Sequence, residues 1–279
     1  MPQAGDLYSW GYFTGTMSGS TRETPARVPT LSGVSSVTGG TYAAYAVLDD
    51  GTVWASGDNF YGQLGNGTHD ASTGPVRVPS LTAVKAVAAG CFSAYALRGD
   101  GTVWAWGNNS HGALGDGTTN DSSIPVQVPG LTGVTRIAAG CFNAYALRGD
   151  GTVWAWGNNS YGALGNGTTN DSSIPVQVTD LTGVTGIAGG STGGYAVRID
   201  GSVWAWGPNG YGDLGNGDGG AGHYSSVPVQ VSRLTQVTAI AAGYDYALAL
   251  RSDGTAWSWG YNGFGVLGNG SRVDSDLLG

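Results

Sequence analysis

Hydrophobic and polar residues alternate along this chain in short runs, and the runs recur in a fixed order. In residues 84–128 the apolar runs fall at 84–89, 94–98, 102–106 and 125–128. Each run is rich in Val, Ala, Tyr or Trp and is bounded by Gly, Asn, Ser or Thr, which is typical of β-strands. The Gly-Asp-Gly sequence at 99–101 is a strong hairpin signal between the second and third runs. The pattern predicts a four-stranded antiparallel sheet.

Side chains two residues apart on a strand point to the same face of its sheet. Trp104 and Trp106 therefore share one face of the third strand, and Tyr95 and Leu97 share one face of the second, whose other face carries alanines. A sheet with bulky residues on one side and small ones on the other can nest against a neighbouring copy. Repeated radially, such sheets form a β-propeller of four-stranded blades, with the tryptophans in the core between blades.

The sheet-forming unit repeats with a period close to 50 residues. Residues 101–128 and 151–178 differ only at His111/Tyr161 and Asp116/Asn166. Because units this short cannot bury their apolar faces alone, we expect them to stack as one repeat domain over residues 1–279. The approximate units are 12–57, 58–107, 108–157, 158–207 and 208–260, with partial units at 1–11 and 261–279.

Four motifs mark each unit most clearly. In one copy they read Asp-Gly-Thr-Val-Trp-Ala-Trp-Gly-Asn at 100–108, Gly-Ala-Leu-Gly-Asp-Gly at 112–117, Pro-Val-Gln-Val at 125–128 and Ile-Ala-Ala-Gly at 137–140. They resemble the repeats of the regulator-of-chromosome-condensation family over nearly the whole chain. The resemblance implies a β-propeller, commonly seven-bladed. In having nearly identical repeats, the chain resembles bacterial, extracellular members of the family. The chain departs from the family where a His usually precedes the second strand. Those positions are Ala43, Ser93, Asn143, Gly193 and Tyr246.

The number of blades stays open at this stage. The first and second strands occur five times, beginning near residues 34, 84, 134, 184 and 237, whereas the Trp-Gly or Ser-Gly end of the third strand occurs six times. Five to six blades are therefore visible. A five-bladed ring with spare N-terminal chain, a partial sixth blade and a fragment of a longer protein all fit this count.

The amino-acid composition also narrows the fold class. Glycine accounts for 52 of 279 residues, 41 % of residues are hydrophobic and only 11 % are charged. A disordered chain would be more charged and poorer in aromatics, and glycine at this density is incompatible with a helical protein. The sequence lacks the Gly-X-Y period of collagen. It also has no apolar run long enough to span a membrane. An all-β, turn-rich domain remains.

Charge and cysteine content bear on partners and location. The net charge is −8 and the pI is near 4.5, which argues against binding to nucleic acid or to an anionic membrane. Residues 1–6 lack the features of a signal peptide. An extracellular location is expected if such a peptide has been removed, and a cytoplasmic location stays open. The sequence favours two free, part-buried thiols at Cys91 and Cys141. A cross-link between neighbouring repeats stays possible if their Cα atoms lie within about 7 Å.

Alternating strand direction predicts where a binding site would lie. The hairpins between second and third strands lie on one face of the disc. All of them carry the same Asp-Gly sequence, which turn formation explains. The opposite face carries variable loops with aromatic residues, which are typical anchors of interfaces. We expect ten residues on it to form a binding surface, although half of these aromatics could instead be tucked under their own loops. The ten are Tyr42, Phe92, Phe142, Tyr244, Asp245, Tyr61, His111, Tyr161, Tyr211 and Phe264.

Signals for catalysis are weak. The three His form no spaced metal pair, no Gly-x-Ser-x-Gly elbow is present, and no glycine-rich stretch leads from a strand into a helix. No cofactor or metal is therefore expected, and only Asp245 between two tyrosines is a candidate for chemistry. The sequence favours a protein-binding scaffold, such as a secreted inhibitor or recognition module. A lectin-like propeller is the alternative, followed by an enzyme and by a structural repeat segment without a site of its own.

Overall fold

The computed structural model describes residues 6–11 and 22–276; the predicted unit that begins at residue 12 therefore starts outside the described residues. The described residues form six antiparallel sheets. The first holds β1 (Tyr8–Gly11) and β2 (Arg22–Arg27), and the last holds β19 (Val237–Ala242), β20 (Tyr246–Arg251) and β21 (Ala256–Gly260). Between them lie four complete sheets. Their strands are β3 (Val34–Gly39), β4 (Ala43–Leu48), β5 (Val53–Gly57), β6 (Ser72–Arg77), β7 (Val84–Ala89), β8 (Ser93–Arg98), β9 (Val103–Gly107), β10 (Ser122–Gln127), β11 (Val134–Ala139), β12 (Asn143–Arg148), β13 (Val153–Gly157), β14 (Ser172–Gln177), β15 (Val184–Gly189), β16 (Gly194–Arg198), β17 (Val203–Pro208) and β18 (Tyr224–Gln230).

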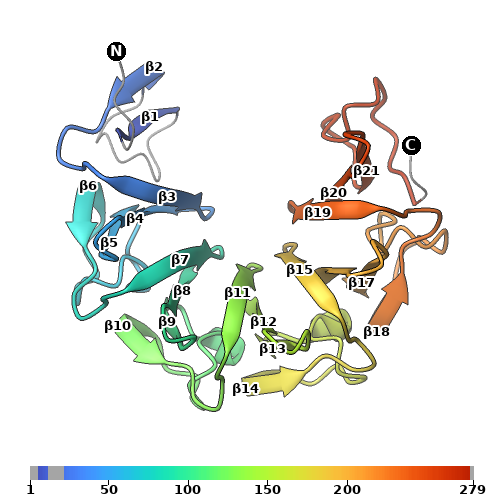
Figure 1. Cartoon of the computed structure of the whole chain (residues 1–279), viewed down its shortest axis with the longest axis horizontal. Coiled ribbons are helices and arrows are strands. Elements are labelled where there is room, and N and C mark those ends of the chain that lie inside the picture. The colour runs from blue at the N-terminus through green and yellow to red at the C-terminus, as the bar shows by residue number, and fades with distance from the viewer. Residues whose placement is uncertain (1–5, 12–21, 277–279) are drawn as a thin grey trace.

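The sheets fan out around a common axis like the blades of a propeller (Figure 1). The first strand of each sheet lies nearest the axis and the fourth lies at the rim. Two single turns of 3-10 helix, η1 (Ser110–Gly112) and η2 (Ser160–Gly162), lie in the loops before fourth strands. The predicted all-β propeller is confirmed.

The described part of the propeller is an open ring, with a gap between the sheet of β1 and the sheet of β21 (Figure 1). Strands β1 and β2 pair with each other and stand in the third and fourth positions of a partial sheet. At the other end, a single bridge between Gly260 and Ser275 replaces a fourth strand. Among the described residues a partial blade is observed, and the alternative of a closed five-bladed ring is wrong.

Strand boundaries in this unit agree with the predicted pattern to within one residue, except at the rim. Strand β7 occupies Val84–Ala89 as expected, whereas β10 begins at Ser122 instead of Pro125. Pro125 therefore lies inside β10, where the register with β9 shifts between Ser122 and Val126. A proline is tolerated there because the outermost strand needs no N–H on its free edge.

Neighbouring blades pack large side chains against small ones. Tyr95 and Leu97 of one sheet lie in a buried cluster with Ala144, Ala146 and Trp156 of the next. Trp156 has no exposed surface, so its position in the core between blades is as predicted. Each sheet presents its Tyr and Leu face to the following sheet and its Ala and Trp face to the preceding one. This directional packing makes the repeats stack in order.

At each of these contacts a shared carbonyl accepts hydrogen bonds from a buried tyrosine and a buried tryptophan. Tyr95 donates from Oη to the carbonyl of Ala113 over 2.7 Å, and Trp156 of the next blade donates from Nε1 to the same oxygen over 3.0 Å. Buried Tyr and Trp need such partners. The arrangement recurs at three other carbonyls, those of Gln63, Ala163 and Asp213.

The glycine beside this contact has a steric reason. Gly115 has a φ of +69°, and a Cβ atom there would lie 2.7 Å from the ring of Trp156. Any other residue would be strained by its backbone conformation and would also clash with the tryptophan. The Leu-Gly step of the repeat is therefore part of the contact between blades.

The hairpin aspartates close their turns, as predicted. Asp100 accepts hydrogen bonds at Oδ1 from Thr102, over 3.0 Å from the backbone N–H and 2.7 Å from the hydroxyl. These bonds hold the pKa of the exposed Asp100 carboxyl below its ordinary value. Equivalent bonds form at Asp50, Asp150, Asp200 and Asp253.

The shared carbonyl can be tested with two substitutions at one blade contact. Tyr145→Phe removes one of the two donors to Ala163 and should lower the free energy of unfolding by roughly 1 kcal/mol. Trp206→Phe removes the other donor and leaves a cavity, and it should cost about 2–4 kcal/mol. Urea unfolding measures both, with the exposed Tyr161→Phe as control. Losses no larger than that of the control would contradict the assignment.

Candidate functional site

Strand register brings the variable loops to one face of the ring. Ser93 at the start of β8 pairs with Gly107 at the end of β9, which also pairs with Ser122 at the start of β10. The loops after first strands and those after third strands therefore emerge at the same edge of every complete sheet. We call this surface the loop face. It comprises residues 40–42, 58–71, 90–92, 108–121, 140–142, 158–171, 190–193, 209–223, 243–245 and 261–274.

Five of the predicted residues meet in one aromatic cluster on the loop face. The rings of Tyr42 and Phe92 stack with centroids 5.0 Å apart, and Tyr61 meets Phe92 edge-on at 5.2 Å. Phe142 lies 5.9 Å from Phe92, and His111 lies 5.9 Å from Phe142. The rings pack on rings of neighbouring loops and blades, so the expectation of a shared face is confirmed for these five.

Phe60 extends the cluster outward and was missed at the sequence level. Its ring lies 4.9 Å from that of Tyr61, and 77 % of its surface is exposed. The signal was present in the sequence, because Phe60 stands where two sibling units have Ser110 and Ser160.

The remaining predicted aromatics do not join this cluster. Tyr161 contacts Tyr224, while Tyr211 and Phe264 both pack against Tyr261. Tyr224 and Tyr261 were not among the predicted residues, because one belongs to a strand and the other replaces an asparagine of the repeat. Tyr244 is 70 % exposed and lines the central pocket described below.

A pocket of about 310 Å³ opens beside the exposed end of the cluster. Its aromatic walls include Tyr42, Tyr61 and Phe92, and its polar walls include Asp58 and His69. The Nδ1 atom of His69 lies 3.0 Å from the backbone carbonyl of Phe60, which ties the two sides of the loop together. This pocket combines flat apolar surfaces with a carboxylate, a combination suited to binding a ligand.

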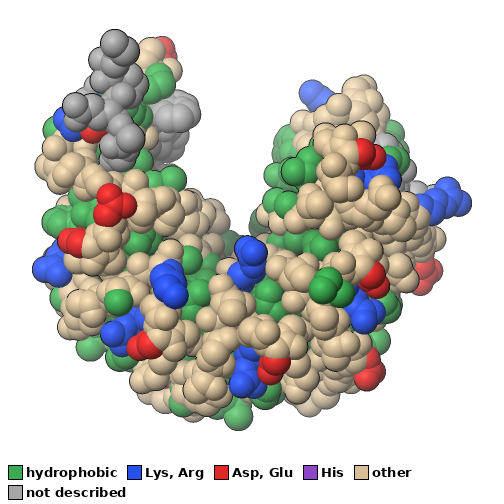
Figure 2. Space-filling model, in the orientation of Figure 1, with side chains coloured by type: hydrophobic (Ala, Val, Ile, Leu, Met, Phe, Trp, Pro, Cys, Tyr) green, Lys and Arg blue, Asp and Glu red, His purple; other side chains and the backbone are tan. Residues whose placement is uncertain are grey.

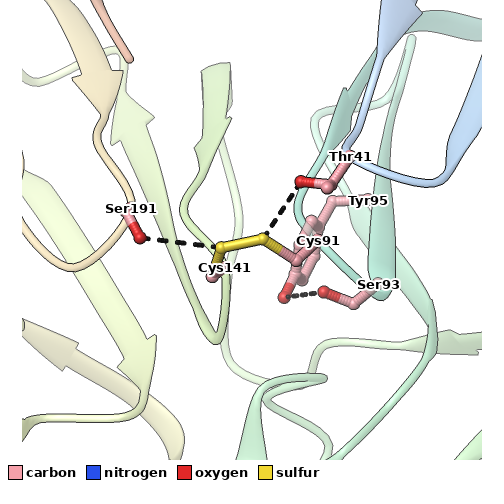
Figure 3. The surroundings of a disulfide bond; sticks show 6 residues. All are labelled: Thr41, Cys91, Ser93, Tyr95, Cys141 and Ser191. Atoms are coloured by element: carbon pink, nitrogen blue, oxygen red, sulfur yellow. Dashed lines mark hydrogen bonds between the residues drawn. A yellow bond between two sulfur atoms is a disulfide. The ribbon is translucent and has the colours of Figure 1, made fainter. Parts of the chain in front are cut away.

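A second pocket of about 290 Å³ lies on the axis, where the first loops of five sheets converge. A disulfide bond between Cys91 and Cys141 crosses its wall and joins adjacent blades (Figure 3). The expectation of free thiols is therefore wrong. The Cα atoms are 4.5 Å apart because the turns approach closely: a Cβ atom on Gly90 would lie 2.4 Å from the carbonyl oxygen of Gly140.

Hydroxyl groups flank the disulfide on both sides. Thr41 Oγ1 lies 3.2 Å from the sulfur of Cys91, and Ser191 Oγ lies 3.7 Å from that of Cys141 (Figure 3). These four residues hold the same position in four consecutive repeats. One row of small side chains therefore lines the axis: two hydroxyl groups with the disulfide between them.

Two carboxyl groups with raised pKa values lie in the loops after β17 and β19. Asp213 is buried, and its Oδ1 atom has no hydrogen-bond partner among the described residues. Burial raises the pKa of Asp213 to about 7 and that of the half-buried Asp245 to about 6. Both line one small cavity. Asp245 was predicted, whereas Asp213 was missed although it stands where sibling units have Ala113 and Ala163.

Among the described residues, no set of metal ligands lies beside this pair. No group of three or more His, Cys, Asp or Glu side chains within 6–11 and 22–276 is arranged to hold a metal ion. No helix in the described part of the chain is both long and apolar enough to cross a membrane. The loop face offers exposed aromatic rings, two pockets and two carboxyl groups with raised pKa values.

Comparison with known proteins identifies relatives of this fold. A family model described as the RCC1-like domain matches residues 1–277. The solved structure of human WBSCR16 superposes with a TM-score of 0.78 at 27 % identity, covering 88 % of this chain and 66 % of that one. The chain therefore spans just under two thirds of that relative's length.

Two structures of a yeast protein superpose over almost the whole chain. Prp20p from Saccharomyces cerevisiae matches with a TM-score of 0.65 at 19 % identity, covering 100 % of this chain and 86 % of that one. Yeast RCC1 (Prp20) bound to Kap60 matches with a TM-score of 0.65 at 18 % identity, covering 98 % and 82 %. No curated protein matches the sequence.

The disulfide leads to a prediction about stability. It closes a loop of 50 residues between adjacent blades, and its loss should lower the free energy of unfolding by about 2–4 kcal/mol. Adding a reductant should lower the Tm of the natural protein, and it should not change the Tm of the Cys91→Ser/Cys141→Ser double variant. Two titratable thiols in the unfolded, unreduced protein would contradict the bond.

The buried carboxyl leads to a prediction about pH. An aspartate in an unfolded chain titrates near ~4, whereas the pKa of Asp213 is raised to about 7. Between these values the folded protein holds a proton that the unfolded chain has released, so this group makes stability fall as pH rises from about 4 to 7. Asp245 acts in the same direction up to about pH 6.

Urea unfolding between pH 5 and pH 7.5 measures this effect. Asp213→Asn should be more stable than the natural protein at pH 7.5 and should lose less stability as pH rises. The exposed Asp180→Asn is the matched control and should keep the natural slope. Parallel pH profiles for the natural protein and Asp213→Asn would show that the buried carboxyl of Asp213 does not hold a proton in the folded state over this pH range.

Proposed function

The chain belongs to the RCC1-like domain family, and from that membership and the loop face we propose that it is a protein-binding scaffold. The observation that carries the proposal is the aromatic cluster of the loop face. The rings of Tyr42 and Tyr61 both contact that of Phe92 although blade packing does not require them, and Phe60 beside them is exposed. Exposed aromatic groups on a rigid support are typical anchors of protein interfaces.

Charge separates the two faces and supports the same assignment. The loop face holds nine aspartates and one Lys or Arg residue, Arg272. The opposite face carries arginines that pair with hairpin aspartates, as Arg251 does with Asp253 at 3.0 Å. Figure 2 shows a face on which Lys and Arg side chains gather, several of them next to Asp. A partner with a basic surface would be attracted to the loop face and not to its reverse.

The related structures support a protein partner as a class. The structure of Prp20p is reported with its binding properties to Gsp1p and histones, and yeast RCC1 is bound to Kap60. At 18–19 % identity these structures share the fold of the present chain, so its own partner has to be found directly. Nucleic acid is not proposed as a partner, because an acidic loop face repels phosphate.

We place the scaffold in an oxidising, extracellular setting, as a secreted inhibitor or recognition module. The disulfide between Cys91 and Cys141 supports this location, because structural disulfides persist mainly outside the reducing cytosol. Recovery of the protein with reduced thiols from its native compartment would argue for a cytosolic scaffold.

A carbohydrate ligand is the second candidate. The pocket beside the aromatic cluster supports it, because Tyr42 and Tyr61 offer flat rings beside the polar side chains of Asp58 and Asn59. A glycan array distinguishes the candidates: salt-insensitive binding to a defined sugar favours the lectin, whereas a protein bound in a stoichiometric complex favours the scaffold.

Affinity capture from the secreted fraction of the source organism tests the scaffold. The natural protein and the Ile124→Ala/Ile174→Ala control, which changes two exposed apolar residues of the rim, should recover the same stoichiometric protein. Tyr42→Ala/Phe142→Ala should reduce recovery by about tenfold or more, as expected for loss of interface anchors. Equal recovery by both double variants, with unchanged Tm values, would move the interface away from the aromatic cluster.

A further inference from the structure

One repeat unit differs from its siblings in the placement of a single carboxylate. Two sibling units have Asn108 and Asn158 after the third strand and an aspartate thirteen residues later. The unit that forms the pocket has its carboxylate at the first of these positions instead of the second. It has Asp58 at the first position and Ala71 at the second.

The exchange changes what the carboxylate can bind. In a sibling unit, Asp121 accepts a hydrogen bond from the backbone N–H of Asn109 over 2.6 Å, so the loop itself uses this carboxylate. Asp171 and Asp274 do the same for their own loops, over 2.8 and 2.7 Å. Among the described residues, the half-buried Asp58 carboxylate makes no ion pair or side-chain hydrogen bond. It lines the pocket instead.

The same unit is also where the aromatic walls are most complete. Phe60 replaces the serine of two sibling units, and it joins Tyr42, Tyr61 and Phe92 around the pocket that holds Asp58. The electron-rich faces of aromatic rings attract cations, most strongly where water is excluded. A carboxylate beside several rings therefore forms a receptor for a flat cation.

The opposite face of this chain shows the same recognition with the cation in place. The guanidinium of Arg251 lies 6.0 Å from the ring centroid of Trp257 while it pairs with Asp253 at 3.0 Å. Arg148 lies in the same way over Trp154, 5.9 Å from its centroid, with Asp150 at 3.9 Å. Rings and a carboxylate are present in the pocket of Asp58, and no Lys or Arg lines it.

We propose that the pocket of Asp58 and Phe60 takes an arginine side chain from a basic protein partner. The proposal rests on the scaffold function above and names the group that the scaffold recognises. Arginine fits better than lysine, because its planar guanidinium can stack on a ring and also pair with a carboxylate through two N–H groups. The acidic character of the loop face favours partners that present such a side chain on a basic surface.

Titration with acetyl-arginine-methylamide tests the pocket without any partner. The chemical shifts of the rings of Tyr42, Tyr61 and Phe92 should change saturably at low ionic strength. The uncharged citrulline analogue should bind at least ~5-fold more weakly, because it keeps the planar shape and loses the charge.

Sibling units supply substitutions that this fold already accommodates. Asp58→Asn and Phe60→Ser introduce residue types found at the same positions of two other units, and each should weaken the arginine probe by about 3–10-fold. Asp116→Asn removes one charge from the same face outside the pocket, at a position where Asn166 occurs in a sibling. It should change the affinity less than ~2-fold at moderate salt, because distant surface charges are screened.

Three results of the probe titrations would overturn the proposal, and so would one result of the capture experiment. They are equal binding of the arginine and citrulline probes, unchanged affinity in Asp58→Asn, and ring shifts caused by neutral oligosaccharides but not by the arginine probe. The last result would assign the pocket to a glycan. A protein captured through the aromatic cluster but unaffected by Asp58→Asn would also overturn the arginine assignment, and it would leave the scaffold function standing.

Discussion

The fold of this protein depends on a carbonyl oxygen that serves two blades at once. At each contact between complete blades, a tyrosine of one blade and a tryptophan of the next donate to the same oxygen, as Tyr95 and Trp156 do at Ala113. A buried tryptophan with an unpaired N–H would cost free energy, and this oxygen removes that cost. Because both donors must reach one atom, the distance and tilt between blades are narrowly defined. The pattern ends at the last sheet, where Leu248 replaces the tyrosine and is 39 % exposed.

A rigid contact between blades leaves the loops free to differ. The repeat can then carry different side chains at one position without a change in the frame, and the informative residues are those that depart from the repeat. Asp58 and Phe60 build a pocket in one unit, and Asp213 buries a carboxyl in another. Cys91 and Cys141 join two units at the axis. Each of these departures changes local chemistry while the blades stay in register.

Much of this could be predicted from the sequence, because local patterns determined it. Alternation predicted strand β7 with its observed ends, and the i, i+2 spacing placed Trp106 in the core between blades. Five of the predicted aromatics meet in one cluster, since they occupy the same repeat position or adjacent loops. The sequence marks Asp213 and Phe60 as departures from the repeat, but the burial of Asp213 and the packing of Phe60 on Tyr61 became visible only in the tertiary structure.

The sequence by itself determined the unit: its strands, its hairpins and the face on which its variable loops lie. These follow from the two-residue period of a strand and from turn chemistry, both of which act over a few residues. The tertiary structure decided how the units meet. It set the 4.5 Å approach of Cys91 to Cys141, the open ring and the pocket beside Asp58. Those features depend on contacts between residues many positions apart, whose distances are set only when all blades pack together.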